Sequence, residues 1–67
     1  MMTTAPLEER DIALLALLAT GAPVEAIARR MDVSERTVRR RTREICDRLD
    51  VGTPVEAVVW AARRGLV

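Results

Sequence analysis

The sequence predicts a small all-α domain, a four-helix bundle that contains a helix-turn-helix. Apolar residues recur at helical spacing in four segments, and turn or capping residues separate these segments. No segment alternates between polar and apolar residues as a half-buried strand does. The chain has 67 residues, enough for one domain, and 49% of them are hydrophobic, which is typical of a globular chain.

The first two helices are predicted from residue 7 to about 20 and from residue 23 to about 31. Acidic residues occupy the first turn of the first helix, where the helix dipole favours them, and Gly21 supplies a left-handed stop. Pro23 suits the first turn of the second helix. The expected inward residues are Leu7, Asp11, Leu14, Leu15 and Leu18 in the first helix and Ile27, Ala28 and Met31 in the second.

Asp32-Val33 leave only a tight turn before a third helix, which is predicted from Ser34 to about Leu49. Ser34 is a preferred N-cap residue. The expected core stripe of this helix is Val38, Ile45 and Leu49. Two short helices joined by a tight turn, with a cationic second helix, are what a helix-turn-helix needs to place one helix in the major groove of DNA.

Positive charge is concentrated on this third helix. The chain carries a net charge of only +1, whereas residues 34–48 hold six arginines against three acidic residues. No acid lies between Arg36 and Arg43, so we expect these arginines to repel one another unless an anion is supplied. A solvated basic face is the alternative interpretation, but the preceding helix and turn favour duplex DNA as the partner.

The chemistry of arginine suits this partner. Its planar guanidinium can bond to guanine N7 and O6 together, and it pairs equally well with phosphate. Ser34 and Thr37, with the amides at the helix start, suit a phosphate, although plain capping also explains them. The side chains in the first two turns that are best placed for base edges are Arg39, Arg40 and Arg43.

A fourth helix is predicted to run to about residue 64 and to end at Gly65. Its start, Thr53-Pro-Val-Glu56, is a capping box with proline at the first helical position. The expected core side holds Ala57 and Ala61, flanked by Val58 and Trp60.

A second apolar stripe lies roughly opposite and consists of Val55, Val59 and Ala62. An outer helix of a small domain needs only one buried face, so this stripe predicts a dimer interface with the same helix of a second copy. Scattered exposed valines in a monomer are the alternative.

Several other classes of protein are disfavoured by the composition. Cys46 is the only cysteine and histidine is absent, which argues against a disulfide and an ordinary zinc site. The acids beside Cys46 would raise the pKa of its thiol, and no catalytic constellation or cofactor motif is present, so we expect no enzyme and no cofactor. Trp60, the only aromatic residue, fits a core position better than a base-stacking role. No membrane-spanning run or signal peptide is evident, so we expect a cytoplasmic protein.

Several motifs keep one register along the chain. They are Leu7-x-x-Arg10-Asp11, Leu17-Leu18-Ala19-x-Gly21, Ile27-Ala28-Arg29-Arg30-Met31-x-Val33-Ser34-x-x-Thr37-Val38-Arg39, Ile45-x-x-Arg48-Leu49-x-Val51 and Glu56-Ala57. Their order and spacing resemble the LuxR-type helix-turn-helix, the DNA-binding domain of NarL/FixJ response regulators, LuxR regulators and GerE. The resemblance covers about residues 7–66 and implies that the third helix reads the major groove and that the fourth mediates dimerisation.

By position, the resemblance implies the contacts of individual residues. The base-reading positions of the family fall on Arg39, Arg40 and Arg43, and the phosphate-contacting positions fall on Ser34, Arg36, Thr37 and Arg41. The chain departs from the usual family residues at Glu8, Val24, Ala26, Arg41 and Pro54, so the sequence preference of a typical member does not carry over.

The sequence therefore predicts a sequence-specific transcription regulator, with a flexible tail over residues 1–6 and the DNA-binding domain over residues 7–67. We expect a weak homodimer that is strengthened on duplex DNA and that has no membrane partner. RNA polymerase is a further candidate partner. The alternative reading, from another class, is a protein-interaction module that grips RNA polymerase and uses DNA only secondarily.

Overall fold

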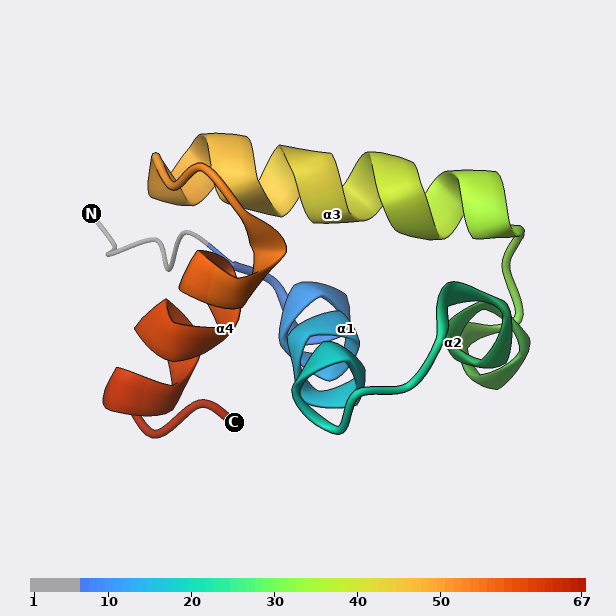
Figure 1. Ribbon diagram of the computed structural model, residues 1–67, viewed down its shortest axis with the longest axis horizontal. Coiled ribbons are helices and arrows are strands. Elements are labelled where there is room, and N and C mark those ends of the chain that lie inside the picture. Colours follow the sequence, from blue (N-terminus) through green and yellow to red (C-terminus); the bar gives the residue numbers. More distant parts are fainter. Residues whose placement is uncertain (1–6) are drawn as a thin grey trace.

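Four helices account for most of the described chain (Figure 1). The structure is a computed structural model that describes residues 7–67, so the tail predicted over residues 1–6 lies outside the described residues. The helices are α1 (Glu9–Ala19), α2 (Val24–Met31), α3 (Glu35–Leu49) and α4 (Pro54–Arg63). Residues 7–67 contain no strand, and the predicted all-α class is confirmed.

The longest helix, α3, lies along one side of the molecule, and the other three helices lie together on the opposite side (Figure 1). α2 lies beneath the N-terminal end of α3, α4 lies near its C-terminal end, and α1 lies between them. α1 contacts all three other helices, whereas α2 and α4 do not contact each other. One long face of α3 therefore packs against the other three helices, and the opposite face points away from them.

The core forms where the four inward stripes meet. Val38 and Ile45 of α3 are buried against apolar residues of the other helices, as their spacing predicts. Leu18, Met31 and Leu49, which the sequence also places inward, are only half-buried at the edge of this core. The largest fully buried side chains are Leu14, Leu15, Ile27, Val38 and Ile45.

Local capping signals fix the starts of α3 and α4 as predicted. The Ser34 hydroxyl oxygen accepts a hydrogen bond from the Thr37 amide at 3.0 Å. At α4, the Thr53 hydroxyl accepts from the Glu56 amide at 3.2 Å, and the Glu56 carboxylate accepts from the Thr53 amide at 3.1 Å. Both helix starts are therefore set by residues within a few positions of one another.

The starts of α1 and α2 differ from the prediction. α1 begins at Glu9 rather than at Leu7, because the Asp11 carboxylate accepts from the Glu8 amide at 2.9 Å and holds Glu8 as an extended N-cap. Pro23 is the N-cap of α2 rather than part of its first turn, and its carbonyl accepts the Ile27 amide at 3.0 Å. The predicted helices survive, but each begins one or two residues later.

The turn between α2 and α3 depends on a left-handed aspartate. Asp32 has φ +58°, and the following Val33 amide returns to the Ala28 carbonyl at 3.0 Å, which closes the end of α2. Ser34 then caps the next helix. The same closure ends α3 at Asp50, with φ +57°, and ends α4 at Gly65, with φ +71°.

An ion pair between a buried carboxylate and a partly exposed arginine joins α1 to α3. The side chain of Asp11 is 3% exposed, and its Oδ2 atom accepts from Arg48 Nη1 at 2.8 Å as well as from the Glu8 amide. The sequence places Asp11 on the inward stripe of α1 but gives no sign of its partner, which lies 37 residues away. A buried carboxylate is tolerated here because its acceptor oxygen is satisfied twice.

Replacing Asp11 with alanine is expected to lower the free energy of unfolding by about 2–4 kcal/mol. Removing one partner of a buried pair costs roughly 3–5 kcal/mol, and the partly exposed Arg48 moves the loss toward the lower end. Urea denaturation followed by circular dichroism measures the change. Glu25→Ala, which removes an exposed acid of α2, is the control and should cost less than about 1 kcal/mol. Equal losses in the two variants would contradict this role for Asp11.

Candidate nucleic-acid interface

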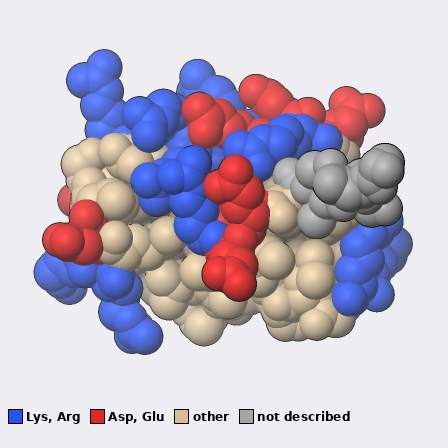
Figure 2. All heavy atoms as spheres, turned by 180° about the vertical axis from the view of Figure 1, so that it is seen from behind, with Lys and Arg blue, Asp and Glu red and all other residues tan. Residues whose placement is uncertain are grey.

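The outward face of α3 carries most of the arginines of that helix. Because Val38 and Ile45 face the core, the residues about half a turn away from them face solvent. Seen from behind, Figure 2 shows arginine side chains gathered along the edge that α3 forms, with acidic side chains between them. The exposed arginines of this outward face are Arg36, Arg39, Arg40 and Arg43.

Two of these arginines have acidic neighbours, which corrects the expectation of an uncompensated basic run. Arg39 pairs with Glu35 at 3.4 Å, and Arg40 pairs with Glu44 at 3.8 Å. Each pair spans one helical turn, so the acids that partner the run lie just outside its ends. All four side chains are about half exposed or more, and ion pairs of this kind contribute at most about 1 kcal/mol.

The remaining arginines of the predicted interface are not paired. Within residues 7–67, Arg36 and Arg43 are exposed and make no ion pair. Arg41 is half-buried, and its Nε atom is buried without a hydrogen-bond partner. Arg36 and Arg43 are therefore the cations of α3 that are most available to an anion.

The start of α3 shows the capping geometry of Ser34, at the position where the sequence predicts a phosphate contact. The Ser34 hydroxyl donates to the Thr37 hydroxyl at 3.0 Å while it accepts from the Thr37 amide. The first amides of a helix have no intrahelical acceptor, so they can donate to an anion. The capping role of Ser34 is confirmed, while the phosphate role predicted for Ser34 and Thr37 stays a prediction.

The two apolar faces of α4 are present as predicted. Ala57 and Ala61 are fully buried, and Val58 and Trp60 flank them in half-buried positions. On the other face, Val55 is 71% exposed and Val59 is 42% exposed, and Ala62 is also exposed. We call Val55, Val59 and Ala62 the α4 stripe. Its exposure is established, whereas its predicted role in dimerisation is not tested by a single chain.

Cys46 and Trp60 lie in environments that suit a packing role rather than a reactive or base-stacking one. Burial, and then the nearby charges of Asp47 and Glu56, raise the pKa of the Cys46 thiol, so its reactive thiolate is disfavoured at neutral pH. Glu56, ten residues away on α4, replaces the sequence neighbour Glu44 that was expected to act on this thiol. The Arg64 guanidinium lies 4.0 Å from the centre of the Trp60 ring. Neither residue lies on the outward face of α3.

This arrangement of helices agrees with a comparison against known protein families. The model for bacterial regulatory proteins of the luxR family matches residues 5–61. The chain belongs to the luxR family. The predicted membership is confirmed, and the match supports the coarser functional prediction of a helix-turn-helix domain for DNA-binding transcription regulation.

Two relatives of this luxR-family domain are longer regulators. The nitrate/nitrite response regulator protein NarL of Escherichia coli (strain K12) is 42% identical over 52 residues, which cover 78% of this chain and 23% of NarL. The transcriptional regulatory protein YdfI of Bacillus subtilis (strain 168) is 36% identical over 61 residues, which cover 91% of this chain and 29% of YdfI. The chain thus spans less than a third of either relative. No solved structure gives a significant match.

No helix within residues 7–67 is long and apolar enough to cross a membrane.

Some features of the luxR-family domain were missed by reasoning from the sequence. The acids that pair with Arg39 and Arg40 lie four residues away from them, a spacing that is visible in the sequence. The Asp11–Arg48 pair had no comparable local signal, because it depends on how α1 packs against α3.

Proposed function

We propose that residues 7–67 bind duplex DNA sequence-specifically, with α3 in the major groove, as the DNA-binding domain of a transcription regulator. The observation that carries the proposal is the pair of exposed, unpaired arginines, Arg36 and Arg43, on the outward face of α3. At about 1.5 Å per residue they stand roughly 10 Å apart along the helix, and a major groove about 12 Å wide admits an α-helix that carries them. Family membership supports the same partner.

The energetics allow Arg39 and Arg40 to take part as well. Their ion pairs with Glu35 and Glu44 are exposed and long, and exchanging such a pair costs at most about 1 kcal/mol. A bidentate contact to guanine contributes roughly 1–3 kcal/mol of discrimination. We therefore keep the base-reading role for Arg39, Arg40 and Arg43, and the phosphate-contacting role for Ser34, Arg36, Thr37 and Arg41.

The relatives support a role in the control of transcription. NarL is a response regulator and YdfI a transcriptional regulatory protein. A chain whose partner is chromosomal DNA would act in the bacterial cytoplasm, with RNA polymerase as a further candidate partner.

Dimerisation through α4 completes the proposed mechanism. The α4 stripe adjoins a shallow hollow of about 290 Å³ between α1 and α4, which is lined by Leu18, Ala19, Pro54, Val55, Val58 and Val59. A second copy related by a two-fold axis would cover both the stripe and this hollow. The stripe is small compared with a standard interface of about 1,600 Å², so we expect weak association in the absence of DNA.

Binding to duplex DNA should weaken steeply as salt is added. Each neutralised phosphate contributes about −0.9 to the slope of log affinity against log salt, so the predicted contacts imply a slope of roughly −3 to −6 for a pair of protomers. Fluorescence anisotropy with a labelled random duplex measures this slope. A slope near zero, or no binding at low salt, would reject the proposal and favour the protein-interaction alternative.

Arg43→Ala and Arg36→Ala should affect DNA binding differently. Loss of a base contact at Arg43 should weaken binding to a selected site by roughly 1–3 kcal/mol and leave much of the non-specific binding in place. Loss of a phosphate contact at Arg36 should weaken binding to all duplexes alike. Parallel titrations on selected and random duplexes compare the two variants. The reverse pattern would exchange the two roles.

Val59→Glu should abolish cooperative binding to a duplex with two half-sites and leave binding to one half-site almost unchanged. The change places like charges across the proposed two-fold axis. Two copies bound to adjacent half-sites then make no favourable contact with each other, so the first copy no longer assists the second. Titrations on one and two half-sites measure the effect, and sedimentation should find the free protein mostly monomeric at micromolar concentration.

The matched control for this variant is Ala16→Glu, which adds the same charge at an exposed position of α1. It should retain cooperative binding. Undiminished cooperativity in Val59→Glu would move the interface away from α4.

A further inference from the structure

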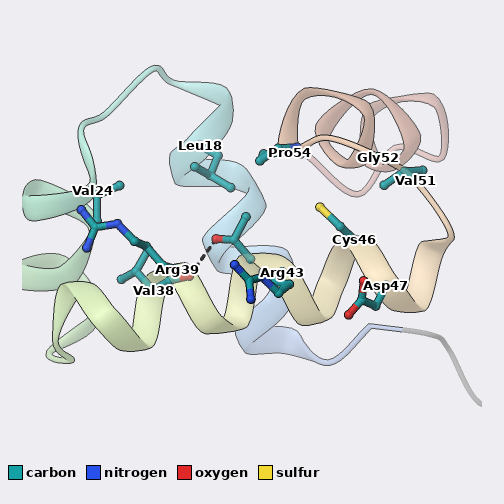
Figure 3. Close-up of a pocket in the computed structure, with 11 residues that line it drawn as sticks. Leu18, Val24, Val38, Arg39, Arg43, Cys46, Asp47, Val51, Gly52 and Pro54 are labelled. Carbon is teal, nitrogen blue, oxygen red and sulfur yellow. Dashed lines mark hydrogen bonds between the residues drawn. The ribbon is translucent and has the colours of Figure 1, made fainter.

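A hollow of about 420 Å³ lies beside α3, between the end of α1, the start of α2 and the start of α4 (Figure 3). We propose that it binds a small apolar carboxylate, and that this ligand competes with DNA for Arg43. The volume falls within the range of about 300–1,000 Å³ that is usual for ligand sites. The walls of the hollow are formed by Leu18, Val24, Val38, Cys46, Val51 and Pro54.

The interior of the hollow suits an apolar group. In Figure 3, the Cys46 sulfur points from α3 toward the space between Leu18 and Pro54. The polar groups between these walls already have partners: the Thr42 hydroxyl donates to the Val38 carbonyl at 2.8 Å, and the Gly52 amide donates to Glu56 at 2.6 Å. An apolar ligand would therefore bury no unsatisfied donor of these groups, and burying one would be costly.

The rim of the hollow determines the charge of the ligand. Arg39 and Arg43 both line it (Figure 3). Arg39 already pairs with Glu35, whereas Arg43 makes no ion pair within residues 7–67. Asp47, one turn further along the helix, also lines the hollow, so the two arginines outnumber one acid there. The guanidinium of Arg43 can therefore hold a carboxylate through two parallel hydrogen bonds. An apolar molecule that ends in a carboxylate matches both the walls and this cation.

The position of the hollow gives the ligand a consequence for DNA binding. Arg43 borders the hollow and also belongs to the outward face of α3. A guanidinium held by a carboxylate is not free to contact a base, so the ligand and DNA would bind in competition. This part of the inference rests on the proposed function, whereas binding of the carboxylate itself does not.

Octanoate is a suitable probe, and its binding can be followed without DNA. Titration of the 15N-labelled domain should give saturable amide shifts centred on Leu18, Val24, Thr42, Cys46 and Val51, with a dissociation constant of about 0.1–1 mM for a ligand of this size. Octylammonium and 1-octanol, which share the apolar chain but lack the negative charge, should bind at least about ten-fold more weakly.

Two variants test the two halves of the site. Arg43→Ala should weaken octanoate binding about ten-fold by removing the cation. Val24→Glu should do the same by placing an acid in the apolar wall, at the first position of α2, where the helix dipole favours an acid. Circular dichroism checks that this variant, whose Val24 packs at the edge of the core, retains the helical fold. Arg30→Ala, which removes an exposed arginine of α2 outside the hollow, is the matched control and should bind octanoate like the unaltered domain. Shifts centred on the α4 stripe, or equal binding by Arg43→Ala, would overturn the site.

Competition is measured separately by anisotropy of a labelled duplex, with sodium acetate at equal concentration as the salt control. Octanoate near saturation should raise the apparent dissociation constant for DNA several-fold, and an unchanged constant would overturn the competition. A domain that binds octanoate in the hollow but no duplex at any salt concentration would support the carboxylate site and reject the proposed function alone.

Discussion

The ion pair between the buried Asp11 and the partly exposed Arg48 is the constraint on which the presentation of α3 depends. A carboxylate that is 3% exposed must be satisfied, and its partners are the start of its own helix and a side chain near the end of α3. The pair therefore fixes both the first turn of α1 and the C-terminal half of α3. The tight turn at Asp32 fixes the other end. Held at both ends, α3 can face outward along its length without being packed on that side.

The outward face of α3 carries exposed arginines, two of which are paired with acidic residues of the same helix. Glu35 and Glu44 partly neutralise Arg39 and Arg40, so the domain avoids a continuous line of repelling cations while it is free. These pairs are exposed enough to open at small cost, whereas Arg36 and Arg43 need no such exchange. Under the proposed function, the acids would favour discrimination over tight non-specific binding, because a poor site offers too few contacts to offset the opening of the pairs.

How much could be predicted from the sequence depended on the distance between the interacting residues. Ser34 and the Thr53–Glu56 box act within a single turn, and both were predicted correctly. The inward stripes were also predicted, since helical spacing alone determines them. Asp11 and Arg48 could not be paired, because only the packing of α1 on α3 brings them together. The hollow beside α3 could not be predicted either, because its walls come from four separate segments of the chain. In contrast, Glu35 and Glu44 lie four residues from Arg39 and Arg40, so the helical spacing in the sequence was enough to predict these two pairs.

Two aspartates with left-handed backbone angles lie at the two ends of α3: Asp32 ends α2 just before α3 begins, and Asp50 ends α3 itself. These closures and the inward side chains Val38 and Ile45 help to position α3. The exposed arginines of the outward face make only weak ion pairs or none within residues 7–67, so they contribute little to the stability of the fold. Substitutions on the buried and exposed sides of α3 therefore affect different properties of the domain. Inward changes alter folding, whereas outward changes alter the proposed contacts with DNA. Under the proposed function, a few outward substitutions would therefore change which duplex is preferred without loss of stability of the domain.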